Sequence, residues 1–136
     1  MKKQSIIKFG TLLLVCCAML GCKKDKTTTI YGTVFNSVTH EPVLDMEVVV
    51  GVKDTYHYHN DTYLISSSVS GTDGLYELAF GEVNVNFPGI YEGQTLPDYY
   101  VKYFLEVNAD GYNKYHQETS IVEGGTYHID INLVPR

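Results

Sequence analysis

The stretch SGTDGLY, from Ser70 to Tyr76, decides how the middle of this chain folds. The run before it, Tyr63 to Val69, is rich in β-branched and small hydroxyl residues, and in the run after it, Leu75 to Phe80, every second residue is large and apolar. Alternation at a period of two is typical of a strand with one buried face. Asp-Gly between two such runs favours a tight turn, because Gly tolerates a positive φ and Asp can bond its own backbone. We therefore expect a hairpin whose buried face carries Tyr76, Leu78 and Phe80.

Further runs on both sides of this stretch alternate in the same way. We expect four more buried faces, made by Ile30, Gly32 and Val34, by Met46, Val48 and Val50, by Tyr103, Leu105, Val107 and Ala109, and by Ile129, Ile131 and Leu133. Gly81 to Asp98 contains Pro and Gly and is expected to be a long connection with a short edge strand at Val83 to Asn86. No window after the amino-terminal segment shows the apolar period of a helix. The pattern predicts an all-β fold, a seven-strand antiparallel β-sandwich.

The amino terminus has the pattern of a targeting segment. Lys2, Lys3 and Lys8 precede an apolar run from Phe9 to Leu20, which is shorter than the roughly 20 residues that cross a bilayer. The run fits the hydrophobic part of a secretory signal. Met19-Leu20-Gly21-Cys22 resembles a bacterial lipobox, in which the Cys is lipidated and becomes the mature amino terminus. We expect a lipoprotein signal peptide at 1–21, a lipidated Cys22 with its tether at 22–28, and a β-sandwich domain at 29–136.

Cysteine content and charge restrict the function of the domain. All three Cys lie at or before position 22, so the mature domain would contain no free thiol, disulfide or Cys-based metal site. From Thr27 onward the chain has four basic and fifteen acidic residues, a net charge of −11. Such a domain repels phosphate backbones, so nucleic acid is not expected as a partner.

The strand motifs carry a family resemblance. The chain resembles the carboxypeptidase regulatory-like domain, a transthyretin-like (prealbumin-like) seven-strand β-sandwich common in secreted and surface proteins of the Bacteroidetes. The resemblance rests on the opening strand (Ile30, Gly32, Val34), on the P-L-x-G-A-x-V motif (Pro42, Val43, Asp45, Met46, Val48), on the turn (Ser70, Gly71, Gly74, Tyr76), on the long strand (Tyr103, Leu105, Val107, Ala109, Gly111, Tyr112) and on the closing Leu133 and Pro135. It implies a folding support, spacer or interaction module that does not act as an enzyme.

Two Tyr-rich or apolar segments form the candidate binding surface, which comprises Tyr56, His57, Tyr58, His59, Tyr63, Phe87 and Tyr91. Tyr offers a large contact area at a low entropy cost, so this surface suits a glycan or an envelope protein. In an extended chain His57 and His59 point to one side and, with Asp54 or Asp61, could hold a metal. The alternative is an exposed polar loop, and we expect neither a metal nor a cofactor. The segment from Pro88 to Pro97 could instead fold over one end of the sandwich.

Other constellations give weaker predictions. Asp45, Asp73 and Asp110 could attract Ca²⁺, but turn chemistry explains the last two without a metal. No His is followed by Glu three residues later, no Gly-x-Ser-x-Gly motif occurs, and no Cys is available as a nucleophile. The end Leu133-Val134-Pro135-Arg136 differs from the Tyr-Arg-Gly-Ser end of the transthyretin-like hydrolases. We therefore expect no catalytic residues.

These observations predict a non-catalytic, lipid-anchored module of the cell envelope with a structural or protein-interaction role. The expected location is the outer membrane, on its periplasmic face or at the cell surface. The expected partners are the membrane, reached through the lipid on Cys22, and an envelope protein or glycan. A glycan- or protein-binding module using the candidate binding surface is the alternative.

Overall fold

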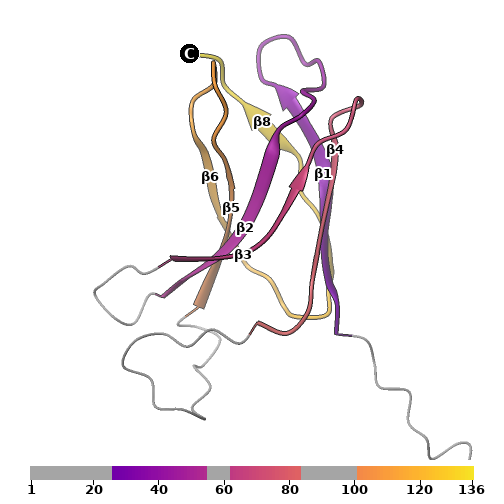
Figure 1. Cartoon of the computed structure of the whole chain (residues 1–136), viewed down its shortest axis with the longest axis vertical. Coiled ribbons are helices and arrows are strands. Elements are labelled where there is room, and N and C mark those ends of the chain that lie inside the picture. The colour runs from indigo at the N-terminus through magenta and orange to yellow at the C-terminus, as the bar shows by residue number, and fades with distance from the viewer. Residues whose placement is uncertain (1–25, 55–61, 84–100) are drawn as a thin grey trace, which may run out of the picture.

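The computed structural model of the chain describes residues 26–54, 62–83 and 101–136 (Figure 1). Every regular element in these ranges is a β-strand. The strands are β1 (Thr28–Asn36), β2 (Glu47–Asp54), β3 (Thr62–Val69), β4 (Leu75–Phe80), β5 (Val101–Val107), β6 (Tyr115–Thr119), β7 (Thr126–His128) and β8 (Ile131–Leu133). A search of the same ranges finds no helix with the length and apolarity needed to cross a membrane.

The strands form two sheets that pack face to face, which confirms the predicted all-β sandwich. One sheet has the order β4-β1-β7, with β8 also pairing with β1, and the other has the order β3-β2-β5-β6. The buried faces are those that the alternation predicts. Between the sheets lie Ile30, Val34, Val48, Val50, Val52, Tyr76, Leu78, Phe80, Tyr103, Leu105, Val107, Ile131 and Leu133.

The chain turns at Ser70 to Tyr76 as predicted, but the predicted hairpin is wrong. β3 pairs with β2 in one sheet, whereas β4 pairs with β1 in the other, so the turn carries the chain across the sandwich. The turn is closed locally, because the Gly71 amide bonds the Leu75 carbonyl and the Gly74 amide bonds the Gly71 carbonyl, both at 2.9 Å. The apolar faces of β3 and β4 therefore face each other across the core instead of lying side by side.

The last strand also differs from the expectation of purely antiparallel pairing. It is divided into β7 and β8, and both pieces run parallel to β1. The division falls at Ile129, whose carbonyl oxygen accepts a 2.6 Å hydrogen bond from the Tyr76 hydroxyl. Gly32 makes room for it, since a Cβ there would lie 1.9 Å from the Ile129 oxygen. Burial raises the pKa of Tyr76, so its hydroxyl remains a donor.

The sandwich has two different ends, visible in Figure 1. At the turn end, three described connections, 37–46, 70–74 and 108–114, join consecutive strands. At the opposite end, the loop end, strands β1, β3 and β5 begin and strands β2 and β4 end. The ladder pairs Thr28–Phe80, Lys53–Thr62 and Asp54–Val101 place these strand ends together. The predicted edge strand at Val83 to Asn86 falls here; Val83 is in no strand, and 84–86 lie outside the described residues.

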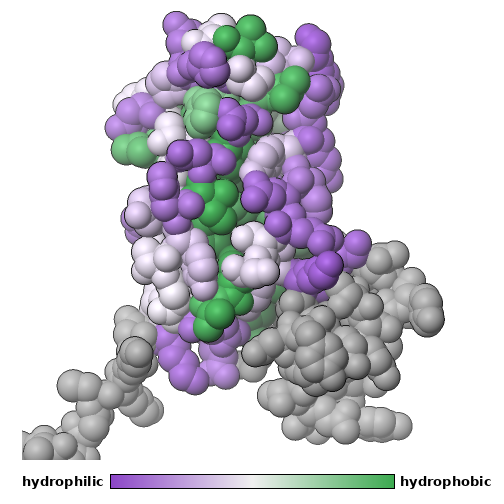
Figure 2. Space-filling view, turned by 180° about the vertical axis from the view of Figure 1, so that it is seen from behind, coloured by the Kyte–Doolittle hydropathy of each residue, from purple (hydrophilic) through white to green (hydrophobic). Residues whose placement is uncertain are grey.

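The two sides of the sandwich also differ. On one side β6 and β8 come into contact, and Tyr112 bridges to Pro135. On the other side β3 and β4 are the edge strands. The view from behind shows hydrophobic residues in a strip along the long axis, between hydrophilic columns (Figure 2). Apolar residues are therefore exposed along part of this face.

Candidate functional site

The loop end brings together the strand ends that flank both segments of the candidate binding surface. Segment 55–61 runs from the end of β2 to the start of β3, and segment 84–100 leads into β5. Lys53 is opposite Thr62 and Asp54 is opposite Val101, so these ends lie on neighbouring strands of one sheet. The two segments therefore start or finish within two strand spacings of each other, at about 4.8 Å per spacing.

Most of the predicted site residues lie outside the described residues. These are Cys22, Tyr56, His57, Tyr58, His59, Phe87 and Tyr91, and the metal alternative that joined His57 and His59 to Asp54 or Asp61 lies there with them. Tyr63 is the described member of the surface. It is opposite Val52 on β3, is half-buried and packs against the core. Its ring therefore contributes to the packing of the core, and only its exposed part could contribute to a surface at the loop end.

A network that the sequence did not predict fastens the described part of the loop end. The Glu123 carboxylate accepts hydrogen bonds from the Val83 amide at 3.2 Å and from the Tyr103 hydroxyl at 3.4 Å. Thr28, which is fully buried, accepts a bond from the Gly124 amide at 2.8 Å through its hydroxyl oxygen. The connection from β6 to β7 thus holds the start of β1 and the residues that precede segment 84–100.

A second cluster lies on the outer face of the sheet β3-β2-β5-β6. Glu106 on β5 pairs with Lys114 at 2.8 Å and with His116 on β6 at 3.3 Å. The His116 ring stacks on the Phe104 ring with 5.1 Å between centroids. Phe104 is only 3% exposed because its ring lies over Gly51, where a Cβ would approach it to 2.4 Å. The charged residues therefore cover an aromatic ring that the core does not contain.

The charges of this cluster are mutually compensated. Burial alone would raise the pKa of Glu106, but the hydrogen bonds and charges of Lys114 and His116 outweigh it and lower the pKa below its ordinary value. The pKa of the neighbouring Glu118 is lowered by its hydrogen bond with Lys102, at 3.1 Å. Lys102 and Glu118 are largely exposed and Glu106 is partly exposed, so each pair contributes little to stability.

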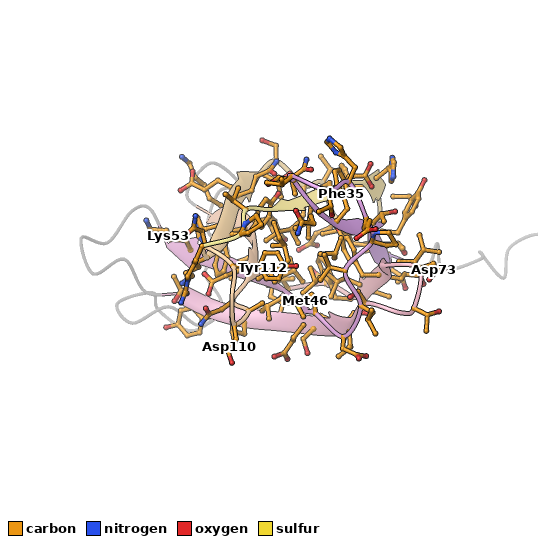
Figure 3. The ribbon with its side chains drawn as sticks, turned by 90° about the horizontal axis from the view of Figure 1, so that it is seen from above. Phe35, Met46, Lys53, Asp73, Asp110 and Tyr112 are labelled. Atoms are coloured by element: carbon orange, nitrogen blue, oxygen red, sulfur yellow. The ribbon has the colours of Figure 1, made fainter. Side chains whose placement is uncertain are left out.

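Side chains that could bind a metal are dispersed among the described residues. A search of these residues finds no cluster of three His, Cys, Asp or Glu side chains that could hold a metal. Asp73 and Asp110 are well separated at the turn end (Figure 3), so the calcium alternative, which joined them with Asp45, has no shared site there.

Sequence reasoning missed the Glu106 cluster because its members come from different strands. Glu106 and His116 are directly opposite each other in the ladder of β5 and β6, although they are ten positions apart in the chain. Two signals could have found them. Glu106 is the polar residue between two core positions of β5, and the turn at Asp110-Gly111 sets the register of the returning strand.

The comparisons with known proteins establish the fold alone. No family model and no curated protein matches the chain. The chain is similar in structure to catechol 1,2-dioxygenase from Acinetobacter sp., with a TM-score of 0.51, 11% identity, and coverage of 82% of this chain and 53% of the dioxygenase. The shaft pilin SpaA from Lactobacillus rhamnosus GG gives a TM-score of 0.49 at 8% identity, covering 82% of this chain and 52% of the pilin. The C-terminal domain of SpaA gives a TM-score of 0.44 at 13% identity, covering 81% of this chain and 98% of that domain.

The chain thus spans about half the length of the dioxygenase that it matches. It is a β-sandwich domain with distant structural similarity to the β-sandwich domains of dioxygenases and pilins.

Proposed function

We propose that this chain is a lipid-anchored β-sandwich module of the bacterial cell envelope, held at the membrane by Cys22, with a structural or protein-interaction role and no enzymatic activity. The observation that carries the proposal is the position of the first strand. β1 begins at Thr28, six positions after Cys22. The sandwich starts where a short polar tether would end.

The tether limits the distance between the sandwich and the bilayer. A fully extended chain spans about 3.5 Å per residue, so six residues reach roughly 20 Å. Because Thr28 lies at the loop end, opposite Phe80, that end stays within this distance of the lipid. The described strand ends that flank the candidate binding surface are therefore close to the membrane.

The proposal includes the assignment to the carboxypeptidase regulatory-like type. Three features of the described residues support it. Gly74 has a φ of 72° in the turn, Tyr76 is buried beside it, and Asp45 has a φ of 57° where that family carries Gly. A positive φ is the conformation that favours Gly, so the chain keeps the backbone of the motif although the residue differs.

Replacing each cysteine in turn tests the anchor. In the full chain expressed in a bacterial host, Cys22→Ala should move the protein out of the membrane fraction and abolish incorporation of labelled palmitate. Cys16→Ala and Cys17→Ala are matched controls, since both lie in the apolar run and neither has the lipobox context. One acyl chain anchors only marginally, so a parent protein that resists salt and carbonate washing implies several chains. Retention of Cys22→Ala in the membrane would refute the anchor.

We also propose that the anchor lies in the outer membrane, on its periplasmic face or at the cell surface. Protease treatment of intact cells separates these two faces. A protein at the surface is cleaved in whole cells, whereas a periplasmic protein is cleaved only after the outer membrane has been opened.

A binding role for the candidate binding surface is the second proposal. It is favoured by the ladder pairs that place the flanking strand ends of both segments on adjacent strands. The full chain should then retain an envelope protein in a pull-down or a glycan on an array. Tyr58→Ala should abolish that binding, whereas Tyr31→Ala, which alters an exposed Tyr in the other sheet, should preserve it. Turnover of a peptide, ester or sugar substrate by the purified chain would contradict both proposals.

A further inference from the structure

The longest edge strand of the described part is β3. It pairs with β2 on one side, and none of the other described strands lies on its second side (Figure 1). An edge strand presents unpaired backbone N–H and C=O groups, which form a template for another strand. Natural proteins protect such edges with charges, Pro, short strands or bulges.

β3 carries little of this protection. Its eight residues, TYLISSSV, include no charged residue and no Pro. The other edge strands of the described sheets are shorter or charged. β4 has six residues and contains Glu77, β6 has five residues and contains His116 and Glu118, and β7 and β8 have three residues each. Within the described residues, the protective device in β3 is an irregularity in its pairing with β2, where the register shifts between Val50 and Gly51.

The outer face of β3 is uncharged and carries two exposed apolar side chains. Leu64 is 72% exposed and Val69 is 60% exposed, and both lie on this strand. Leu64 is opposite Gly51, which has no side chain to cover it. Exposed apolar side chains beside an unprotected strand edge are typical of a surface that is covered when the protein meets its partner.

We propose that β3 is the contact between two copies of this chain, which pair antiparallel about a two-fold axis between Ile65 and Ser66. The pattern of faces along the strand supports this partner. Four residues face the interior and four face outward, as their partners on β2 and their burial indicate. The inward set is Tyr63, Ile65, Ser66 and Ser68, and the outward set is Thr62, Leu64, Ser67 and Val69.

Reversal of the strand about this axis maps each set onto itself. Thr62 meets the partner's Val69, Leu64 meets the partner's Ser67, and so on along the strand. The irregularity is what makes this possible, because it leaves Ile65 and Ser66 on the same face at the centre of the strand. A one-residue slip would place inward residues opposite outward ones. A two-fold contact uses the same patch on both subunits, and β3 is self-complementary in this sense.

The pairing would also cover the exposed apolar residues. Leu64 becomes a diagonal neighbour of the partner's Val69, at a separation of about 7–8 Å that long side chains bridge. The symmetry repeats this contact. On β2, Lys53 is opposite Thr62, and Glu47 is opposite Val69. Because Thr62 meets the partner's Val69, Lys53 of one copy and the partner's Glu47 flank the same cross-strand pair with charges of opposite sign. An unrelated peptide would need its own matching pattern, whereas a second copy supplies it.

The pairing has a geometric consequence that does not depend on the lipid. Because the two strands run in opposite directions, the two loop ends point away from each other. The two chains therefore enter their first strands at opposite ends of the dimer.

The first experiment measures the mass of the full chain in mild detergent by multi-angle light scattering over a dilution series. The parent should have the mass of two chains and dissociate to one on dilution. Ser67→Lys places a charge on the exposed edge and should leave single chains at every concentration. Leu75→Lys is the matched control, since Leu75 is an exposed residue of the other edge strand, and it should remain dimeric. A monomeric parent, or a Ser67→Lys variant as dimeric as the parent, would overturn the proposal.

The second experiment tests the register. In the full chain, Leu64→Cys combined with Ser67→Cys should give a disulfide between copies on oxidation, because facing Cα atoms lie about 4.5–5.5 Å apart. Mass spectrometry of the linked peptides separates this bond from any bond of the native cysteines, which all lie at or before position 22. Leu64→Cys with Val69→Cys should cross-link much less. Equal cross-linking of the two pairs would refute the two-fold axis between Ile65 and Ser66.

Discussion

The two ends of the sandwich are held by different kinds of contact. At the turn end the connections are joined by buried hydrogen bonds, such as those of Ser70, whose hydroxyl donates to the Val43 carbonyl at 2.8 Å and accepts from the Met46 amide at 3.0 Å. The described contacts at the loop end depend more on single side chains, above all the exposed Glu123. Among the described residues, the difference indicates that buried hydrogen bonds specify the turn end more than the loop end.

The largest expected difference between the ends is the response of their turn glycines to a methyl group. Gly74→Ala at the turn end should lower the free energy of unfolding by about 3 kcal/mol, the sum of a left-handed backbone and an overpacked neighbour. Gly74 has a φ of 72°, and a Cβ there would lie 2.5 Å from the Val34 oxygen and 2.9 Å from Pro42. Urea denaturation of the purified chain measures the loss.

Gly124→Ala is the control at the loop end. Its φ of 82° is equally unfavourable, but the nearest atom to an added Cβ is 3.6 Å away, an ordinary contact. We therefore expect a loss of about 1–2 kcal/mol, from the backbone alone. Equal losses at the two glycines would remove the distinction between the ends.

The next comparison concerns the buried hydroxyls. Ser70→Ala should cost about 2 kcal/mol, because it leaves the Val43 carbonyl and the Met46 amide without this partner in a site that is 1% exposed. Thr28→Val at the loop end keeps the shape of the side chain and removes one acceptor, that of the Gly124 amide. Its expected cost is about 1 kcal/mol. Thermal unfolding followed by circular dichroism ranks the pair, and a larger cost at Thr28 would reverse our conclusion.

The smallest expected effect is a pH dependence from the Glu106 cluster, which lies near the turn end because Lys114 belongs to the connection 108–114. The pKa of Glu106 is lowered in the folded chain, so the folded state favours the carboxylate more than the unfolded state does. Its contribution to stability is present above the ordinary pKa of 4.5 and is lost as the pH falls through the lowered value. Below pH 4.5, the free energy of unfolding of Glu106→Gln should therefore fall less steeply with decreasing pH than that of the parent.

Denaturation of parent and variant at several pH values measures this slope. Glu77→Gln, which alters an exposed Glu of β4, should keep the slope of the parent. The cost of Gly74→Ala relative to Gly124→Ala should also be the same at each pH, since Glu106 pairs with Lys114 and His116 on the outer face of its sheet and not with a residue beside either glycine. A change in that relative cost with pH would mean that the ion pairs act on one end.

The sequence predicted which residues are buried far better than it predicted which strands are neighbours. Alternation identified Ile30, Val48 and Leu105 as core residues, because the side-chain period depends on the local backbone alone. It could not distinguish a hairpin at Asp73-Gly74 from a crossing between sheets, since both need the same turn and the same alternation. The choice depends on β1, which is distant in the chain and takes β4 as its partner.

Local chemistry also explains a departure from the family pattern. Asp45 stands where the resemblance implies Gly, and its φ of 57° shows that the backbone still requires the left-handed region. Asp tolerates this region better than most residues do.

The candidate site was less predictable. The partners of Glu106 depend on the register between β5 and β6, and the Glu123 contacts join residues 20 to 40 positions apart.

The place of β1 in its sheet has a consequence for the order of assembly. The first strand of the domain lies between β4 and the last two strands, and the Thr33 amide bonds the Asp130 side chain 97 positions later in the chain. A chain that emerges amino terminus first cannot complete this sheet until its final residues have followed. Contacts of such long range fold slowly. The sheet is therefore completed only after β7 and β8 have emerged, and until then the first strand remains without its parallel partners.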